Sequence, residues 1–234
     1  VIESNSTEAG SLIFTTPAGG TDPQATVQLY IPVSTGDGTT LDWHNVGSPV
    51  WSGATAADFY IGEDNDAWLM GYDPTVQLPL NYDPLNPFLG AWLPETDLNA
   101  PLPGARGHFF AWRNNPTTRD NTGIFTFTGT IAGEQEQEVL TYTGSSGPGD
   151  NNFNLIANPF TCGIDLVVEE NVWQTEGIEP AVWIWDQVAG NYRYESVPGS
   201  GGGSGDNGNY PQFATDIIAM GQGLFVRTVA NATH

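Results

Sequence analysis

An internal duplication limits the folds open to this chain more than any other property of its sequence. Residues 43–50 (WHNVGSPV) and 153–160 (FNLIANPF) both open on an aromatic side chain and contain a proline, and Pro49 and Pro159 lie 110 positions apart. Other blocks recur in the same order, with insertions between them. These pairs are 12–15 with 124–127 and 27–30 with 139–142 at a spacing of 112, 72–73 with 185–186 at 113, and 106–111 with 222–227 at 116. The repeats predict two related halves, residues 1–120 and 121–234.

The segments between turn-forming residues are short and rich in β-branched and aromatic side chains. Runs such as 25–33, 107–112 and 181–186 are bounded by Gly, Pro, Asn or Asp, which is typical of strands joined by turns. Seven of the 17 prolines fall in residues 73–103, which predicts a long irregular excursion with a short edge strand at 89–93. We therefore predict an all-β fold of two related antiparallel β-sandwich halves, jelly-roll-like in form.

The charge balance is strongly acidic. The chain has 27 Asp and Glu residues, five Arg and no Lys, which gives a formal charge of −22 and an isoelectric point near 4.1. Such a field repels nucleic acid and anionic bilayers, so both are excluded as partners. Bound cations or a saline exterior medium fit this charge better. The absence of Lys also excludes Schiff-base chemistry and Walker-type phosphate binding.

Several properties of the sequence favour an exported protein. Cys162 is the single cysteine, which excludes an internal disulfide framework and leaves an intermolecular bridge as the alternative. The chain lacks any window of about eighteen apolar residues, so no membrane insertion is predicted. It begins at Val1 without a charged and then apolar leader, and we expect a processed product.

The second half carries an ordered set of short motifs. They are FNLIANPF at 153–160, ID at 164–165, AVWIWD at 181–186, NY at 191–192 and IIAMGQGLFV at 217–226. In this order they resemble the "NLIGNPYP…ID…IYVWD…NY…IAPGQGFFV" module of large secreted and surface proteins of Bacteroidota, which usually precedes a type IX secretion sorting domain. Residues 43–50 resemble the "WHLIGSPV" opening of a preceding copy.

The resemblance implies an exported, non-catalytic β-sandwich segment of a cell-surface or extracellular protein. It supplies no catalytic residues that could be carried over to this chain. The sequence departs from the module at four positions, where the module has Gly, Pro, Pro and Phe: Ala157, Thr161, Met220 and Leu224.

Histidine is the usual general base or metal ligand, and the duplication tests each internal one. His44 corresponds to Asn154 and His108 corresponds to Leu224, while His234 is terminal. A histidine replaced by leucine at the equivalent place indicates a structural position. These substitutions therefore argue against a zinc site or a histidine base.

Other reactive groups also favour structural interpretations. Cys162 corresponds to Ser52, a small residue after the proline turn, which indicates packing rather than a nucleophile. A glycosidase needs two acids about 5 to 9.5 Å apart across a sugar. The adjacent acids Glu169 and Glu170 are more simply explained as solvated charge. We predict no catalytic residues and no enzyme.

The sequence predicts no cofactor, with calcium as the one alternative. Asp64, Asp66, Asp150 and Asp206 lie in Asp- and Asn-rich turns that offer hard oxygen ligands. None of these turns has the complete twelve-residue loop of an EF-hand. Ordinary turns stabilised by Asx side chains are the alternative interpretation.

Exposed tryptophans provide a candidate platform for stacking a sugar ring. Trp92 and Trp173 are the candidates, because their sequence surroundings are polar or proline-rich. Trp183 and Trp185 share one face of a predicted strand with Ile184 opposite. Most aromatics of a β-sandwich fill its core, and this is the alternative for all of them.

These observations predict a non-catalytic structural or adhesive protein of the bacterial cell surface or extracellular space. Its expected partners are itself, as a homo-oligomer, fibre or surface layer, or other surface proteins and glycans. A carbohydrate-binding module that uses exposed Trp is the second hypothesis. A hydrolase of unrecognised type is the third.

Overall fold

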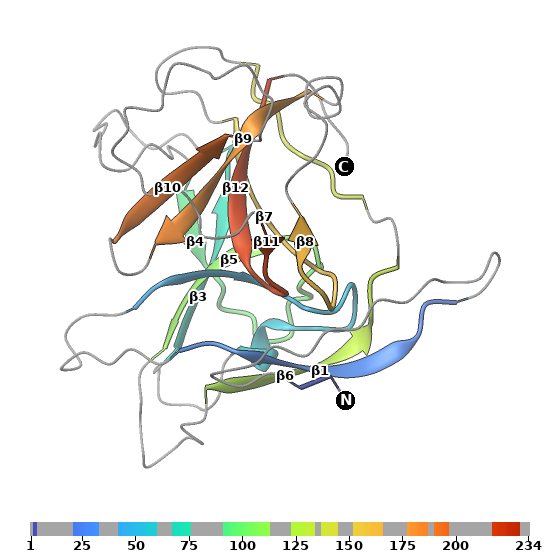
Figure 1. Ribbon diagram of the computed structural model, residues 1–234. Coiled ribbons are helices and arrows are strands. Elements are labelled where there is room, and N and C mark those ends of the chain that lie inside the picture. The colour runs from blue at the N-terminus through green and yellow to red at the C-terminus, as the bar shows by residue number, and fades with distance from the viewer. Residues whose placement is uncertain are drawn as a thin grey trace.

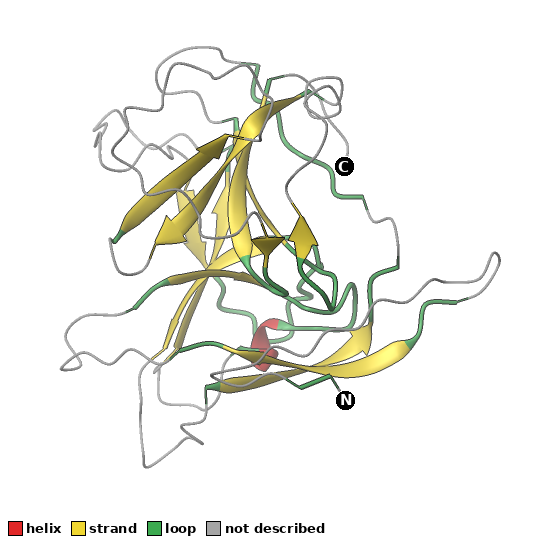
Figure 2. Cartoon of the chain, in the orientation of Figure 1, coloured by secondary structure: helices red, strands yellow, loops and turns green. Residues whose placement is uncertain are grey.

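The computed structural model describes residues 2–3, 21–32, 42–59, 67–75, 91–112, 123–133, 137–144, 152–165, 177–186, 190–196 and 217–229. Here the fold is all-β with antiparallel sheets, as the sequence predicts. One 3-10 turn (Ala56–Asp58) is the single helical element of this part (Figures 1 and 2). None of the described residues belongs to a helix with the length and apolar character needed to cross a membrane.

The first half forms a four-stranded antiparallel sheet. Its strands are β2 (His44–Gly47), β3 (Ala67–Asp73), β4 (Ala91–Pro94) and β5 (Gly107–Trp112), in the order β2-β5-β3-β4. β5 matches the predicted strand at 107–112. β4 falls close to the edge strand predicted inside the proline-rich excursion, and an edge position tolerates the terminal Pro94.

The second half forms a sheet of the same design. Its strands are β7 (Phe153–Ala157), β9 (Ile178–Asp186), β10 (Asn191–Ser196) and β12 (Gly223–Thr228), in the order β10-β9-β12-β7. The sequence blocks pair β2 with β7, β3 with β9 and β5 with β12. Read in that correspondence, the two sheets have the same strand order, which confirms that the duplication is structural.

The strand registers repeat as well. Gly47 lies opposite Gly107 in the first sheet, and the equivalent Ala157 lies opposite Gly223 in the second. At the far end of the same ladder, His44 lies opposite Phe110. The equivalent pair, Asn154 and Val226, is matched in the same way. The spacings of 110 and 116 residues therefore identify positions that are equivalent in space.

The correspondence of β4 with β10 emerges from the structure alone. Trp92 lies opposite Tyr72 in the first sheet, and Tyr192 lies opposite Trp185 in the second. Tyr72 and Trp185 are equivalent by sequence, so Trp92 and Tyr192 are equivalent too. The intervening segments differ in length, which shortens the spacing to 100 residues and hides this pair in the sequence.

A third sheet joins the two halves. β1 (Gln24–Tyr30) pairs antiparallel with β6 (Ile124–Thr130), and the two strands run side by side below the larger sheets (Figure 1). A short pair, β8 (Ile164–Asp165) and β11 (Ile217–Ile218), completes the described strands. The division into domains at residue 120 stays a prediction, and strands from both sides of it share one sheet.

The main hydrophobic core also draws on both halves. In β6, Phe125 and Phe127 alternate with outward-facing threonines, as a strand with one buried face requires. These two phenylalanines pack around Phe59 of the first half, with ring centroids 6.1 and 5.0 Å away. Phe110 of β5 joins the same cluster at 5.1 Å from Phe59. The strands of one half therefore cover apolar surface of the other.

One predicted correspondence is wrong in register. The spacing of 112 pairs Val27 with Val139, yet Val27 is fully buried and Val139 is 73% exposed. Its neighbour Leu140 is buried instead. A shift by one residue moves every side chain of an extended segment to the other face. Residues 27–30 and 139–142 are therefore not equivalent at this spacing.

Candidate functional site

Most of the predicted site residues lie outside the described part of the chain. These residues are Asp64, Asp66, Asp150, Asp206 and Trp173. Calcium binding and a platform at Trp173 therefore stay predictions. Among the described residues, no three His, Cys, Asp or Glu side chains gather as they would around a metal ion.

Trp92 is half-buried in a cluster of aromatic rings. Its ring meets Tyr72 edge-on at 5.2 Å, meets Phe225 edge-on at 5.9 Å, and lies tilted at 4.9 Å from Phe109. These contacts join the two four-stranded sheets, because Phe225 belongs to β12 of the second half. Trp92 thus contributes to packing between the sheets, which is the alternative that the sequence left open for it.

The aromatic cluster repeats itself across the two sheets. The ring centroids of Tyr72 and Trp92 are 5.2 Å apart, and the angle between the ring planes is 66°. For the equivalent pair, Trp185 and Tyr192, the centroid distance is 5.0 Å and the interplanar angle is 65°. Between the sheets, Tyr72 meets Phe225 at 4.9 Å and 85°. Trp185 and Phe109, which are the equivalents of Tyr72 and Phe225 in the opposite halves, have a centroid distance of 5.4 Å and an interplanar angle of 83°. Such reciprocal contacts define an isologous interface, here formed within one chain around a pseudo-twofold axis.

Backbone contacts obey the same pseudo-symmetry. The Gly47 amide donates to the Gly221 carbonyl at 2.9 Å, and the equivalent Ala157 amide donates to the Ala105 carbonyl at 2.9 Å. Gly47 and Ala157 touch each other, since a Cβ on Gly47 would fall on the Ala157 side chain. Glycine at position 47 therefore permits the close approach of the two copies.

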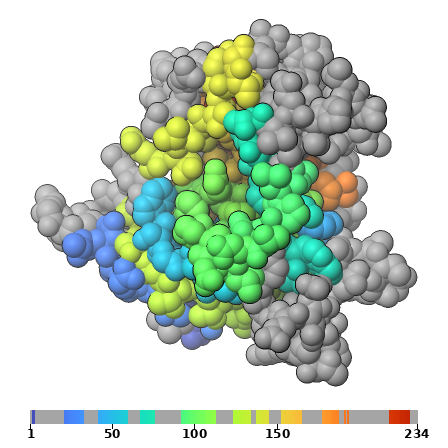
Figure 3. All heavy atoms as spheres, turned by 180° about the vertical axis from the view of Figure 1, so that it is seen from behind, coloured from blue at the N-terminus to red at the C-terminus, as the bar shows by residue number. Residues whose placement is uncertain are grey.

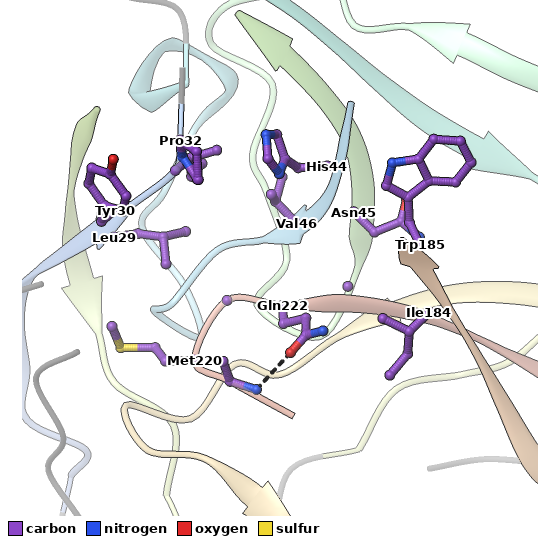
Figure 4. Close-up of a pocket in the computed structure, with 14 residues that line it drawn as sticks. Leu29, Tyr30, Pro32, His44, Asn45, Val46, Ile184, Trp185, Met220 and Gln222 are labelled. Atoms are coloured by element: carbon purple, nitrogen blue, oxygen red, sulfur yellow. Dashed lines mark hydrogen bonds between the residues drawn. The ribbon is translucent and has the colours of Figure 1, made fainter. Parts of the chain in front are cut away.

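A pocket of about 280 Å³ lies where this pseudo-symmetry fails. It is bounded by the end of β1, by β2, by β9 and by the turn at 219–223 (Figure 4). Its walls are largely apolar, and polar side chains from β2, β9 and the turn complete the lining. The apolar residues are Leu29, Val46, Ile184 and Met220, and the polar ones include His44, Asn45, Trp185 and Gln222.

His44 lines this pocket and carries a buried hydrogen-bond acceptor. Burial lowers the pKa of His44 to about 4, although Asp42 and a hydrogen bond to the Pro32 backbone oppose the shift. The imidazole is therefore neutral near pH 7. Within the described chain Nε2 has no hydrogen-bond partner, so the bond to the Pro32 carbonyl comes from Nδ1. A neutral ring protonated on Nδ1 carries its lone pair on Nε2.

Two unpartnered donors accompany this acceptor. Asn45 Nδ2 and Trp185 Nε1 are buried and, among the described residues, make no hydrogen bond. The other amide atom of Asn45, Oδ1, accepts a hydrogen bond from the Tyr192 hydroxyl at 3.4 Å. Burial also raises the pKa of Tyr192, so its hydroxyl keeps the proton that it donates.

The equivalent position in the second half has its hydrogen bonds satisfied. Asn154, the counterpart of His44, donates to the carbonyls of Thr141 and Asn152 at 3.0 and 3.1 Å. Its oxygen accepts from the Thr141 amide at 2.8 Å. Leu155 replaces Asn45 there and brings no polar group. At this position the second half therefore satisfies its polar groups with hydrogen bonds, whereas the described residues of the first half leave His44 Nε2 and Asn45 Nδ2 without partners.

His108, Cys162 and Glu179 lie outside this pocket. His108 lies inside the first sheet, and burial, with a smaller contribution from Arg106, lowers its pKa to about 4. Burial raises the pKa of the Cys162 thiol, which disfavours the nucleophilic thiolate. Glu179 forms an ion pair with Arg227 at 2.8 Å.

No family model, curated protein or solved structure matches the chain. The Bacteroidota resemblance therefore stays an expectation that rests on its motifs. Sequence reasoning did not assign Asn45 or Trp185 to a site, and it treated His44 as structural. The signal was present in the duplication, because His44 and Asn45 are the positions at which polar groups differ from Asn154 and Leu155.

Proposed function

We propose that this chain is a non-catalytic structural or adhesive protein of the bacterial cell surface or extracellular space. The observation that supports this role best is the reciprocal packing of two copies of one sheet. Aromatic rings and backbone hydrogen bonds lock the copies together around a pseudo-twofold axis. This arrangement gives a β body whose repeated design lies in its interior packing, as a load-transmitting or spacing element requires.

Strand edges are the surface through which such a body associates with further copies. β4 is the outer described strand of its sheet, and β10 is its equivalent in the second sheet. Leu93 of β4 is 47% exposed, and Leu98 beyond it is 46% exposed. Residues 91–112 occupy the centre of the face seen in Figure 3. An edge strand with exposed apolar side chains favours pairing with another chain.

The acidic composition supports an exterior location and regulation of association by cations. A charge of −22 keeps copies apart at low ionic strength. Calcium or salt screens this repulsion, and carboxylate-rich turns would bind Ca²⁺. Export by a type IX route belongs to the same proposal, and the motif resemblance is its support.

Size measurements on the purified chain test the proposal. We expect light scattering and negative-stain microscopy to show ordered fibres or sheets in millimolar Ca²⁺. Leu93→Lys adds a charge to the edge strand, so this variant should remain dispersed. Val229→Lys is the matched control, because Val229 is 50% exposed but lies outside β4. A monomer of 25.1 kDa with and without Ca²⁺ would contradict self-assembly.

A further inference from the structure

Three residues that line the pocket beside β2 each carry a buried polar atom without a hydrogen-bond partner in the described chain, which is unusual for a protein interior. Buried polar groups are almost always hydrogen-bonded, and a group left without a partner needs an explanation. Here His44 Nε2, Asn45 Nδ2 and Trp185 Nε1 all belong to residues that line one pocket. The second half has no unpartnered groups at the equivalent positions of His44 and Asn45, because Asn154 is hydrogen-bonded and Leu155 has no polar side-chain atom. Three atoms without partners in the described chain at one place call for a partner, and a bound small molecule would supply it.

The hydrogen-bonding character of the three groups limits the class of that partner. Asn45 and Trp185 donate, whereas neutral His44 accepts through Nε2. A hydroxyl group both donates and accepts, so a molecule with adjacent hydroxyls can satisfy all three. An anion would face the His44 lone pair and a chain of charge −22. A cation would face two N–H donors, and both charged classes are therefore disfavoured.

The walls and the size of the pocket suit a small ring with apolar faces. Leu29, Val46, Ile184 and Met220 offer surface for C–H groups. The indole edge that carries Nε1 of Trp185 faces the side of the pocket on which His44 stands (Figure 4). A volume of about 280 Å³ is at the lower limit of ligand pockets, which range over about 300–1,000 Å³. It admits a one- or two-ring molecule rather than a long chain.

We infer that this pocket binds an uncharged, hydroxyl-rich small molecule of the sugar class, held by His44, Asn45 and Trp185. The three polar atoms are buried in the ligand-free structure. Binding therefore requires the His44 or Trp185 side chain to turn toward the pocket. The polar atoms that lack partners in the described chain then form hydrogen bonds with the hydroxyl groups of the ligand. The site is distinct from the Trp92 platform, because Trp92 does not line this pocket, although Trp92 and Trp185 both contact Phe109.

Isothermal titration calorimetry on the full chain tests the inference. The probes are neutral sugars, namely glucose, galactose, mannose, N-acetylglucosamine and cellobiose, with glucuronate and glucosamine as charged counterparts. We expect at least one neutral sugar to give saturable binding in the micromolar to millimolar range, and its charged counterpart to bind more weakly. Absence of saturable heat with every neutral sugar, or preferred binding of a charged one, would overturn the inference.

Variants that copy the other half locate the site with little risk to the fold. Asn45→Leu reproduces Leu155, and His44→Asn reproduces Asn154; each should weaken sugar binding by about tenfold or more, the effect of losing one hydrogen bond to a buried group. The matched control, Trp92→Tyr, reproduces Tyr192 and should leave the affinity unchanged. If Trp92→Tyr abolished sugar binding and Asn45→Leu retained it, the sugar would bind at the Trp92 ring cluster, and the proposed pocket site would be refuted.

Each variant is checked for folding by far-UV circular dichroism before titration. Should one pocket variant fail to fold, the other carries the comparison. The titration of the unchanged chain decides the ligand class without either of them. Self-assembly is measured separately by light scattering. Absence of sugar binding would therefore contradict the pocket inference alone, and absence of assembly would contradict the structural role alone.

Discussion

Two histidines stay uncharged inside this protein because burial withdraws them from water. His44 is exposed to the solvent only in part, and His108 is 4% exposed. For both residues burial is the largest cause of a pKa lowered from 6.5 to about 4. An unfolded chain would bind protons on these side chains well above the pH at which the folded chain does. Acid therefore favours unfolding through each of them.

We predict that the histidines make the fold sensitive to mild acid. A lowered folded-state pKa means that the unfolded state binds more protons between about pH 6.5 and pH 4, so the free energy of unfolding falls as the pH falls through this window. The loss is at most about 3 kcal/mol for each histidine. Urea denaturation at pH 7.5, 6.0 and 4.5 measures it.

The double variant His44→Asn with His108→Leu is the matched control for this effect. Both changes copy the residues of the second half, Asn154 and Leu224, into equivalent positions. The many carboxylates titrate in both proteins, so the difference between the two pH profiles isolates the histidines. Equal slopes between pH 7.5 and 4.5 in the two proteins would show that burial does not hold these rings neutral.

At the scale of elements, short apolar runs bounded by turn residues were sufficient to predict most strands. β5 matches residues 107–112, and β9 extends the predicted run 181–186 by three residues. The packing of the two sheets against each other could not be predicted, because it depends on contacts between residues far apart in the sequence, such as Tyr72 with Phe225 and Phe109 with Trp185. The pocket follows from that packing. Its polar residues come from β2, β9 and the turn at 219–223, whose proximity no local pattern reveals.

Close approach of elements makes glycine necessary at the start of β5. A Cβ on Gly107 would lie 2.6 Å from Leu155 Cγ and 2.7 Å from the Ile156 carbonyl oxygen of β7. We predict that Gly107→Ala lowers the free energy of unfolding by about 1–3 kcal/mol, because the two strands must separate. Urea denaturation monitored by tryptophan fluorescence measures the loss.

Gly71→Ala provides the comparison in the same sheet. Its added Cβ would have one neighbour, the Leu93 carbonyl oxygen at 4.0 Å, which is ordinary contact. We expect this variant to change stability by less than about 1 kcal/mol, since added bulk meets no clash and a strand glycine is intrinsically unfavourable. A loss at Gly71 as large as that at Gly107 would refute the packing explanation.

On the scale of the whole molecule, two of the three core clusters of the described residues draw on both halves, and the third belongs to the second half alone. β6 of the second half supplies Phe125 and Phe127 to a core that also contains Phe59 and Phe110 of the first. A second cluster joins Tyr72 to Phe153, Leu155 and Phe225. Each half would therefore expose large apolar surface if it stood alone.

We predict that residues 1–120 and 121–234 do not fold as separate monomers, although the sequence divides them so clearly. The full chain should unfold in a single calorimetric transition, because the shared cores couple the halves. Expressed separately, each half should be unfolded or should self-associate, since the pseudo-twofold interface between similar sheets can also form between two identical ones. Size-exclusion chromatography with light scattering and far-UV circular dichroism distinguish these states. A monomeric half with a cooperative melt, or two resolved transitions in the full chain, would show that the repeats are autonomous domains joined by a dispensable interface.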